Sequence, residues 1–310
     1  MIKAPREIAV IDCGTNTFNL LIAVEHQQGW KALVRRKKVV KLGAGGIKAG
    51  IIAPERIVKA IEALADYRHT LEKRGITTFR ITGTAALRDA RNGPDVLSRI
   101  RKETGFQIEL IDGEREAELI RKGVAQAIDL GSDVSMIMDI GGGSTEFILC
   151  NSDEVFWKKS YRLGAARLLE EIYPSDPISA NEQGRLQDFL ENQLADLESA
   201  CKKYRPKRLI GSSGSFDTFA AILRKKECLP PIRKSHYCFD LKSYHRLHKE
   251  LVHSSYKERL KIPGMLRMRA DMIVLASLLL TFVLQKTRIG KLELSTYALK
   301  EGILSEMLAD

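Results

Sequence analysis

The sequence is poor in cysteine and lacks an apolar run long enough to cross a membrane. Its five cysteines, at positions 13, 150, 201, 228 and 238, form no Cys-x-x-Cys pair. This spacing argues against a zinc site or a disulfide framework and favours the reduced thiols of a cytoplasmic protein. The longest apolar run, residues 272–284, is shorter than the roughly 20 residues of a membrane-spanning helix. The first residues contain no apolar signal core, so we expect a cytoplasmic protein with no membrane partner.

Aromatic residues make up only 6% of the chain, which leaves little material for stacking nucleic-acid bases. No zinc-finger spacing and no RNA-binding aromatic pattern accompanies them. The net charge is nevertheless +11, and both halves are basic: residues 1–131 have 23 Lys and Arg against 16 Asp and Glu, and the remainder has 27 against 23. Such a charge attracts anions. A small polyanion held between the halves fits this charge as well as nucleic acid does, so charge alone does not choose between them. With the aromatic patterns missing, we expect no nucleic-acid partner.

What the sequence does contain is one short pattern that occurs twice. In the first copy an apolar run ends at Asp12, Gly14 follows two residues later, and a second apolar run begins at residue 18. The second copy repeats this order from Asp139, 127 positions further on, with Gly141 and a run from residue 145. In each copy a hydroxyl residue stands five positions after the aspartate, Thr17 in one and Ser144 in the other. The repetition indicates an internal duplication.

A strand that ends in a carboxylate and returns through a glycine turn suits phosphate chemistry. Glycine lets a ligand approach the backbone, whose N–H groups can bind anions, while the carboxylate can hold a metal ion or a water. Two such hairpins facing each other would form a phosphate clamp. The candidate phosphate-binding residues of the two turns are Gly14, Thr15, Asn16, Thr17, Gly141, Gly142, Gly143 and Ser144.

The order of the predicted strands and helices also occurs twice. The first half predicts strands at 8–12, 18–25 and 31–42, a helix from 54, a strand at 78–82, helices at 85–89 and 94–104, a strand at 106–111 and a helix at 114–128. The second half predicts strands at 134–140, 146–151 and 155–161, helices at 166–172 and 181–204, a strand at 208–211, a helix at 216–225, a helical insertion, a strand at 291–294 and a helix at 297–307.

This order is that of an α/β, ribonuclease H-like domain, and its duplicated form, with an interdomain cleft, is the superfold of actin, Hsp70 and the sugar kinases. We place the N-terminal domain at residues 1–128 and the C-terminal domain, with its helical insertion, at residues 129–310. Two unrelated α/β domains are the alternative, which the repeated hairpin disfavours.

Three further segments carry candidate site residues. Glu114, Glu116 and Glu118 open a helix that leads to the second hairpin, where a carboxylate could serve as a general base, although acidic residues in a first turn are often only dipole partners. Thr84 and Arg88 combine a helix start with an arginine, a phosphate-binding arrangement that could equally be a solvated surface. Residues Gly211, Ser212, Ser213 and Gly214 form a weaker strand-to-helix motif. The histidines at 245, 248 and 253 are interpreted as a solvated helix face.

Together these segments resemble the exopolyphosphatase/guanosine pentaphosphate phosphatase family over nearly the whole chain. The matching blocks are residues 11–17 (IDCGTNT), 84–92 (TAALRDARN), 111–117 (IDGEREA), 139–146 (DIGGGSTE), 161–168 (YRLGAARL) and 269–274 (RADMIV). The resemblance implies hydrolysis of a terminal phosphoryl group from inorganic polyphosphate or guanosine pentaphosphate, with magnesium or another divalent cation. It implies Glu116 as catalytic base, Asp139 as the carboxylate of the metal and lytic water, Asp12 as a second metal ligand, and Arg88 as a substrate-facing arginine.

The chain departs from the family pattern in two places. Asp112 and Arg115 stand where the family usually has serine and glutamate, which puts metal affinity and chain specificity in question. The chain also resembles the short members without a C-terminal HD-type domain, which favours short-chain polyphosphate or the nucleotide. Two alternatives stay open: an ATP-dependent kinase or ATPase of the same superfold, and a non-catalytic alarmone-binding module. The sequence does not decide whether the protein is a homodimer.

Overall fold

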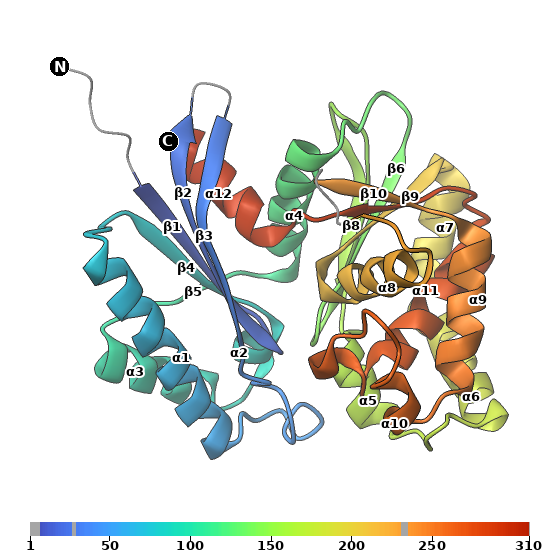
Figure 1. The fold of residues 1–310 in the computed structure, drawn as a ribbon, viewed down its shortest axis with the longest axis horizontal. Coiled ribbons are helices and arrows are strands. Elements are labelled where there is room, and N and C mark those ends of the chain that lie inside the picture. Colours follow the sequence, from blue (N-terminus) through green and yellow to red (C-terminus); the bar gives the residue numbers. More distant parts are fainter. Residues whose placement is uncertain (1–6, 27–28, 231–234, 310) are drawn as a thin grey trace. The chain divides into compact units, whose positions relative to one another are not determined.

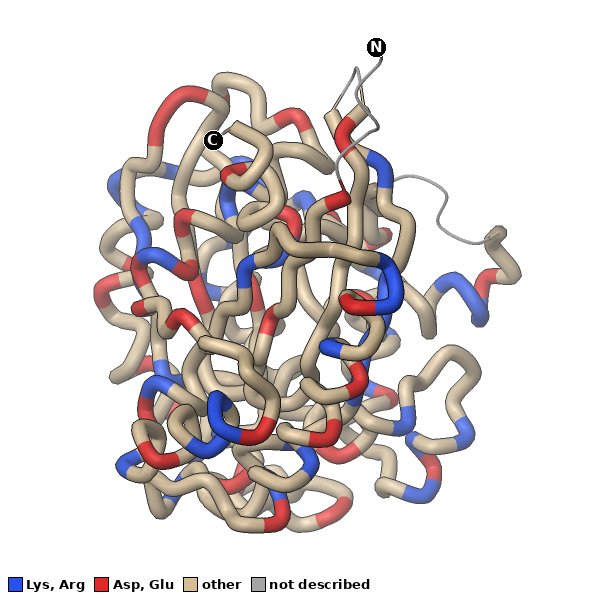
Figure 2. Tube along the Cα trace, turned by 90° about the vertical axis from the view of Figure 1, so that its left-hand side faces the viewer, with Lys and Arg blue, Asp and Glu red and all other residues tan. Residues whose placement is uncertain are grey.

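The computed structural model describes residues 7–26, 29–230 and 235–309 (Figure 1). The chain forms two compact units, one of residues 1–123 with 299–310 and one of residues 124–298. Basic and acidic residues are interspersed along most of the trace (Figure 2). Within the described part of the chain, no helix has the length and apolar content needed to cross a membrane. All five cysteines are free thiols, and Cys13, Cys150 and Cys201 are buried.

Unit 1 is built on a five-stranded sheet in the order β3-β2-β1-β4-β5. The antiparallel meander comprises β1 (Glu7–Cys13), β2 (Thr17–His26) and β3 (Gly29–Val39), and β4 (Phe79–Gly83) and β5 (Glu109–Leu110) continue it in parallel. The helices are α1 (Pro54–Lys73), α2 (Ala85–Asp89), α3 (Gly93–Thr104), most of α4 (Gly113–Ala127) and α12 (Leu299–Ala309).

The two faces of this sheet are covered by different helices. Ile11, Leu20 and other residues of one face join the core cluster that α1 and α3 complete. Because side chains alternate along a strand, Val10, Asp12 and Leu21 lie on the opposite face. There α12 packs against β1 and β2. Asp12 is therefore a polar residue on the α12 face of an otherwise apolar central strand.

Unit 2 repeats this topology with one additional strand. Its order, β8-β7-β6-β9-β11-β10, matches that of unit 1 and then adds the antiparallel β10. The strands are β6 (Ser135–Ile140), β7 (Thr145–Cys150), β8 (Val155–Tyr161), β9 (Arg208–Ser212), β10 (His236–Phe239) and β11 (Leu292–Ser295). The helices are α5 (Ala165–Ile172), α6 (Ala180–Gln193), α7 (Ala195–Tyr204), α8 (Ser213–Lys226), α9 (Leu241–His253), α10 (Tyr256–Arg259) and α11 (Ile273–Thr287), with a 3₁₀ turn, η1 (Arg267–Arg269). The duplicated ribonuclease H-like fold is confirmed.

Several expectations from the sequence need correction. The single helix predicted over 181–204 is two helices, divided at Leu194, whose backbone leaves the helical region. The insertion contains the strand β10, which the helical prediction missed. The predicted division at residue 128 is also wrong for the end of the chain. The last helix belongs to unit 1, where Glu301 accepts a hydrogen bond from Arg35 at 2.7 Å.

The last helix is held to unit 1 by a cluster of charges around Glu306. Arg80, Arg115 and Lys122 all form ion pairs with its carboxylate. Burial alone would raise the pKa of Glu306, but the charges and hydrogen bonds of Lys122 and Arg115 outweigh it and hold that pKa below its usual range. A lowered pKa means that the folded state favours the charged form.

We therefore expect Glu306→Gln to lower the free energy of unfolding at pH 7 by about 1 kcal/mol, because three cations lose their shared partner. The contribution of Glu306 is complete above the unfolded pKa of about 4.3 and is lost as the pH falls through the lower folded pKa. Urea denaturation over a pH series measures both effects. Glu103→Gln, which breaks an exposed pair with Arg99, is the control. A difference between wild type and Glu306→Gln that stays constant from pH 7 to about 3 contradicts the assignment.

Candidate active site

The first turn, residues 14–17, is closed by a hydrogen bond from the Gly14 N–H to the Thr17 carbonyl at 3.1 Å. A Cβ at Gly14 would lie 3.1 Å from that carbonyl oxygen, which is closer than side chains normally tolerate. Thr15, Asn16 and Thr17 are all buried. The carbonyls of Thr15 and Asn16 accept hydrogen bonds from the loop that follows β3. The turn is thus fixed through its carbonyl groups.

Asp12, at the end of β1, lies in a row of polar residues that crosses the sheet. Its cross-strand partner Asn19 donates a hydrogen bond to its Oδ2 at 3.0 Å. Lys37 pairs with Asn19 on β3, and Thr82 pairs with Asp12 on β4. Cross-strand partners point to the same face, so the row reads Lys37, Asn19, Asp12, Thr82. The buried Thr82 hydroxyl has no hydrogen-bond partner among the described residues.

A lysine of the last helix adds positive charge near Asp12. Burial would lower the pKa of Lys300, but the carboxylates of Glu301 and Asp12 outweigh it and raise that pKa. Lys300 also forms an ion pair with Glu301 at 3.2 Å. The Lys300 cation therefore interacts electrostatically with the carboxylate at the end of β1.

Arg88 and Glu116, two residues predicted separately, are in direct contact. Arg88 lies on α2, which begins after Thr84 at the end of β4. Its Nη1 donates to Glu116 Oε2 at 3.1 Å and to the Ile111 carbonyl at 2.9 Å. Glu116 is only 7% exposed. The ion pair fixes a buried carboxylate beside the cation, and the alternative of a solvated surface arginine is wrong.

The two departures from the family pattern have structural roles in this chain. The Asp112 side chain accepts a hydrogen bond from the Arg115 N–H at 2.7 Å and so caps the start of α4. Arg115 contacts Glu118 and Glu306 rather than Glu116. Neither replacement touches the carboxylate of Glu116, so the candidate base is preserved.

Asp139 occupies in unit 2 the position that Asp12 has in unit 1. It is 4% exposed, and its Oδ2 accepts hydrogen bonds from the hydroxyls of Ser212 at 2.6 Å and Ser213 at 2.7 Å. Ser213 has a φ of +70°, a conformation that is unusual for serine. The strained turn brings a second hydroxyl to the same carboxylate oxygen.

A second carboxylate, which sequence reasoning did not single out, lies beside Asp139. Glu146 is its direct cross-strand partner on β7 and is 1% exposed. Its Oε1 accepts a hydrogen bond from Ser160 on β8 at 2.7 Å. The row Ser160, Glu146, Asp139, Ser212 is the counterpart of the row in unit 1. One available signal was the position of Glu146 as a charged residue in the apolar run after the second turn.

The second turn, residues 141–144, is fixed like the first. The Gly141 N–H donates to the Ser144 carbonyl at 3.0 Å. The carbonyls of Gly141, Gly142 and Gly143 accept hydrogen bonds from the start of α5, including one from the Arg167 guanidinium at 2.9 Å. Among the described residues, no acceptor is found for the N–H groups of Gly142 and Gly143. The turn is therefore packed on its carbonyl side and can offer its amides to an anion.

The motif at residues 211–214 does not offer four free groups to a phosphate. A Cβ at Gly211 would collide with the ring of Phe216, and one at Gly214 would lie 2.2 Å from Nη2 of Arg269. The serine hydroxyls between them bind Asp139. Arg269 is 6% exposed; burial lowers its pKa, with the charges of Asp217, Asp271 and Asp139 opposing this. The close approach of Arg269 explains why residue 214 is glycine. It also gives a structural role to the sequence block 269–274, which contains this arginine.

No group of three or more His, Cys, Asp or Glu side chains converges as a metal site within the described part of the chain. Asp139 and Glu146 are a cross-strand pair of carboxylates beside the second turn. His248 is not on a solvated face as predicted: its Nδ1 lies 2.8 Å from the Ser277 hydroxyl. Burial lowers the pKa of His248 to about 4.

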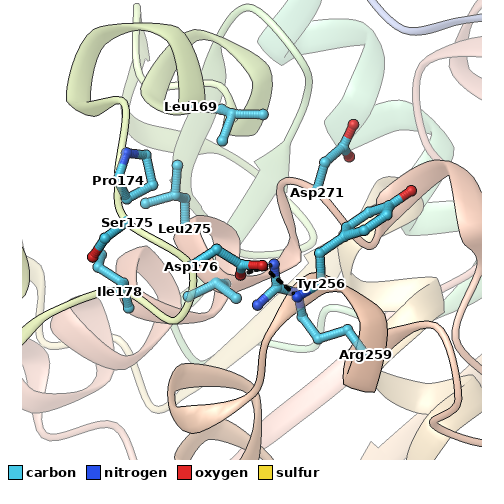
Figure 3. A pocket seen from close by; sticks show the side chains of 10 residues that line it. Leu169, Pro174, Ser175, Asp176, Ile178, Tyr256, Arg259, Asp271 and Leu275 are labelled. Atoms are coloured by element: carbon cyan, nitrogen blue, oxygen red, sulfur yellow. Dashed lines mark hydrogen bonds and ion pairs between the residues drawn. The ribbon is translucent and has the colours of Figure 1, made fainter.

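A further pocket of unit 2 contains none of the predicted site residues. It has a volume of about 200 Å³ and lies between the end of α5, α10 and the start of α11. Asp176 and Arg259 face each other across it, with Nη2 of Arg259 donating to Asp176 at 2.8 Å (Figure 3). The same guanidinium donates to the carbonyls of Ala270 and Ser254. These contacts give Arg259 a structural role.

Comparisons with known proteins agree with this geometry. A model of the Ppx/GppA phosphatase family matches residues 21–310. The crystal structure of an exopolyphosphatase from Cytophaga hutchinsonii has a TM-score of 0.95 and 40% identity, covering 98% of both chains. Exopolyphosphatase 1 of Mycobacterium tuberculosis is 27% identical over 97% of this chain and 88% of its own length. A guanosine-5'-triphosphate,3'-diphosphate pyrophosphatase of Photobacterium profundum is also 27% identical, but this chain covers 59% of its length. The chain belongs to the Ppx/GppA phosphatase family.

Proposed function

We propose that this protein is an exopolyphosphatase, which releases the terminal phosphate of inorganic polyphosphate by attack of water. The observation that carries the proposal is the pair of buried carboxylates, Asp139 and Glu146, on either side of a turn in which the amides of Gly142 and Gly143 find no acceptor among the described residues. Amides that bind phosphate oxygens and carboxylates that hold a cation are the two components that phosphoryl transfer requires.

The relatives favour polyphosphate as the substrate. The Cytophaga and Mycobacterium proteins are both named exopolyphosphatases, and this chain covers at least 88% of each. Guanosine pentaphosphate is the second candidate, because the Photobacterium pyrophosphatase matches almost all of this chain. Its name describes action on a guanosine polyphosphate, which shares the terminal phosphoanhydride with polyphosphate.

In the reaction, a water oxygen forms a bond to the terminal phosphorus and the bridging phosphorus–oxygen bond breaks. The products are inorganic phosphate and a chain shortened by one unit. Glu116 accepts the proton of the attacking water, since a general base must present an unprotonated carboxylate. Arg88 binds the oxygens of the phosphoryl group, and its contact with Glu116 keeps both side chains in one place.

Magnesium suits the oxygen donors that the structure offers. It prefers hard oxygen ligands, keeps several waters and needs only one or two carboxylates besides substrate phosphates. In unit 2 Asp139 and Glu146 would hold it, and in unit 1 Asp12 is the residue proposed for this role. When bound, the cation neutralises phosphate oxygens and polarises the phosphoryl group.

A phosphate-release assay tests the proposal directly. Polyphosphates of graded length, guanosine pentaphosphate and ATP are compared at equal phosphate concentration with magnesium present. Release from polyphosphate alone supports an exopolyphosphatase, and release from the nucleotide alone supports the second candidate. Preferred release from ATP would identify an ATPase of the same superfold. Tight binding of guanosine pentaphosphate without any release would identify a binding module.

Glu116→Gln is expected to lower kcat by about 10²–10⁴-fold, because the amide cannot accept the proton of water. The dissociation constant for polyphosphate, measured by calorimetry, should change little. Glu114→Gln on the same helix is the matched control and should keep nearly wild-type turnover. If Glu116→Gln turns over normally and Glu114→Gln does not, the base is Glu114.

Asp139→Asn is expected to raise the magnesium concentration for half-maximal activity by about tenfold or more, because one anionic ligand is lost. Magnesium titrations of phosphate release measure this change. Asp153→Asn, an exposed aspartate in the turn before β8, should leave the titration unchanged. Full wild-type activity in excess chelator would exclude a metal role for Asp139.

Arg88→Ala should raise KM for polyphosphate by about 10-fold or more, because a charge-assisted contact to the substrate is removed. The structure adds a second effect that sequence reasoning did not foresee. Loss of Arg88 leaves Glu116 buried without its cation, so the free energy of unfolding should fall by about 1–3 kcal/mol. Arg88→Lys keeps the charge and should recover part of KM. An unchanged KM in Arg88→Ala would exclude substrate contact.

A further inference from the structure

The charge of unit 1 is concentrated in one stretch, which we name the basic segment (residues 29–54). It contains seven Lys and Arg residues and no Asp or Glu. Its basic residues are Lys31, Arg35, Arg36, Lys37, Lys38, Lys41 and Lys48. The acid-free run with the next largest number of basic residues, 199–216, contains five Lys and Arg residues. A run of one sign next to a candidate phosphate site calls for an explanation beyond solubility.

The basic segment comprises the edge strand β3 and a glycine-rich loop. The N–H groups of Val40 and Lys41 both donate to the Asn16 carbonyl, and that of Gly43 donates to the Thr15 carbonyl. The basic segment is therefore hydrogen-bonded directly to the first turn, which we propose binds phosphate. It continues that site without a break in the chain.

The lysines and arginines of β3 are divided between its two faces. Arg36 and Lys38 face α1, where both form ion pairs with Asp66 at 3.2 and 2.9 Å. By alternation Arg35 and Lys37 lie on the other face, which is the face of Asp12. Lys31 lies beyond the register shift of β3, where its pairing with Val24 places it on the α1 face. On the Asp12 face Lys37 is exposed, and Arg35 forms an ion pair with Glu301. This face of the strand therefore has one exposed lysine, Lys37.

Lys37 links this face to the candidate site. It ends the polar row that crosses the sheet through Asn19 to Asp12. Two strand spacings of about 4.8 Å place its backbone about 10 Å from that of Asp12. This separation is too large for the phosphoryl group that reacts beside Asp12, but it suits phosphates further along the same chain.

Protection of an exposed strand edge is the simpler explanation for lysines on β3. The equivalent edge strand of unit 2, β8, shows how many basic residues serve to protect a strand edge in this protein. It has Lys158 and Lys159, with Asp153 and Glu154 directly before it, and Lys159 pairs with Asp196. Edge protection does not account for seven basic residues without an acid, nor for the continuation of the charge into the loop at the first turn.

We propose that the basic segment is a secondary subsite that binds the distal phosphates of linear polyphosphate. This rests on the proposed function and adds that the enzyme holds long chains, in contrast to the short-chain preference inferred from the family. A nucleotide or RNA fits less well, because Trp30 is the one aromatic residue of the segment. Arg35 already lies over its ring at 5.6 Å. The feature that this surface recognises is a series of phosphate charges without attached nucleobases.

The test compares a long-chain polyphosphate with tripolyphosphate, which is too short to extend over the roughly 10 Å from Asp12 to Lys37. The Lys37→Glu/Lys48→Glu variant should raise KM for the long chain by about tenfold or more and KM for tripolyphosphate much less. The plot of log kcat/KM against log salt should also become less steep for the long chain only. Lys59→Glu/Lys102→Glu, on exposed positions of α1 and α3, changes the net charge equally and should leave both KM values nearly unchanged.

Three results would overturn the subsite: equal changes in KM for the two substrates, an equal effect of the control variant, or competition by RNA as strong as that by long polyphosphate. Lys37→Gln/Lys48→Gln repeats the test if the glutamate variant unfolds. If wild type releases phosphate from neither polyphosphate, the proposed function fails. In that case, equilibrium binding of long polyphosphate to wild type and to the variant still tests the subsite.

Discussion

The residues around the second turn of unit 2 have to compensate the free-energy cost of burying two carboxylates side by side. Asp139 and Glu146 are direct cross-strand partners and are almost fully buried. Like charges in this arrangement repel each other, and a buried charge without partners costs several kcal/mol. Serine hydroxyls meet part of this cost, with Ser212 and Ser213 on one carboxylate and Ser160 on the other. The hydroxyls supply no positive charge, but the guanidinium of Arg269 interacts electrostatically with Asp139 and supplies part of it.

The same constraint explains the local conformation around the pair. Ser213 adopts a positive φ at the start of α8, and its hydroxyl reaches Asp139 from there. Gly214 leaves space for the guanidinium of Arg269. In unit 1 the corresponding position beside Asp12 holds the neutral Asn19, so that carboxylate has an amide partner instead of a second acid. The duplication has preserved the geometry of the row and changed its charge.

The two glycine turns follow a common principle. In each, neighbouring elements bind the carbonyl groups: the loop after β3 in unit 1 and the start of α5 in unit 2. When the protein itself binds the carbonyls of a turn, the groups left to bind a ligand are the amide N–H groups, which are donors. Donors fixed in advance bind an anion without the cost of ordering a mobile loop. The arrangement suits a substrate whose surface consists of phosphate oxygens.

The sequence by itself determined the duplicated fold, both hairpins, the family and most of the candidate site. These features rest on signals between near neighbours in the chain: alternating apolar runs, glycine turns, and an aspartate at each strand end. Only the tertiary structure decided which of these residues meet. Arg88 and Glu116 are 28 positions apart, and Arg115 and Glu306 are 191 apart. Such contacts follow from strand register and helix packing, so Glu146 beside Asp139 and the return of the last helix to unit 1 became visible only in the folded chain.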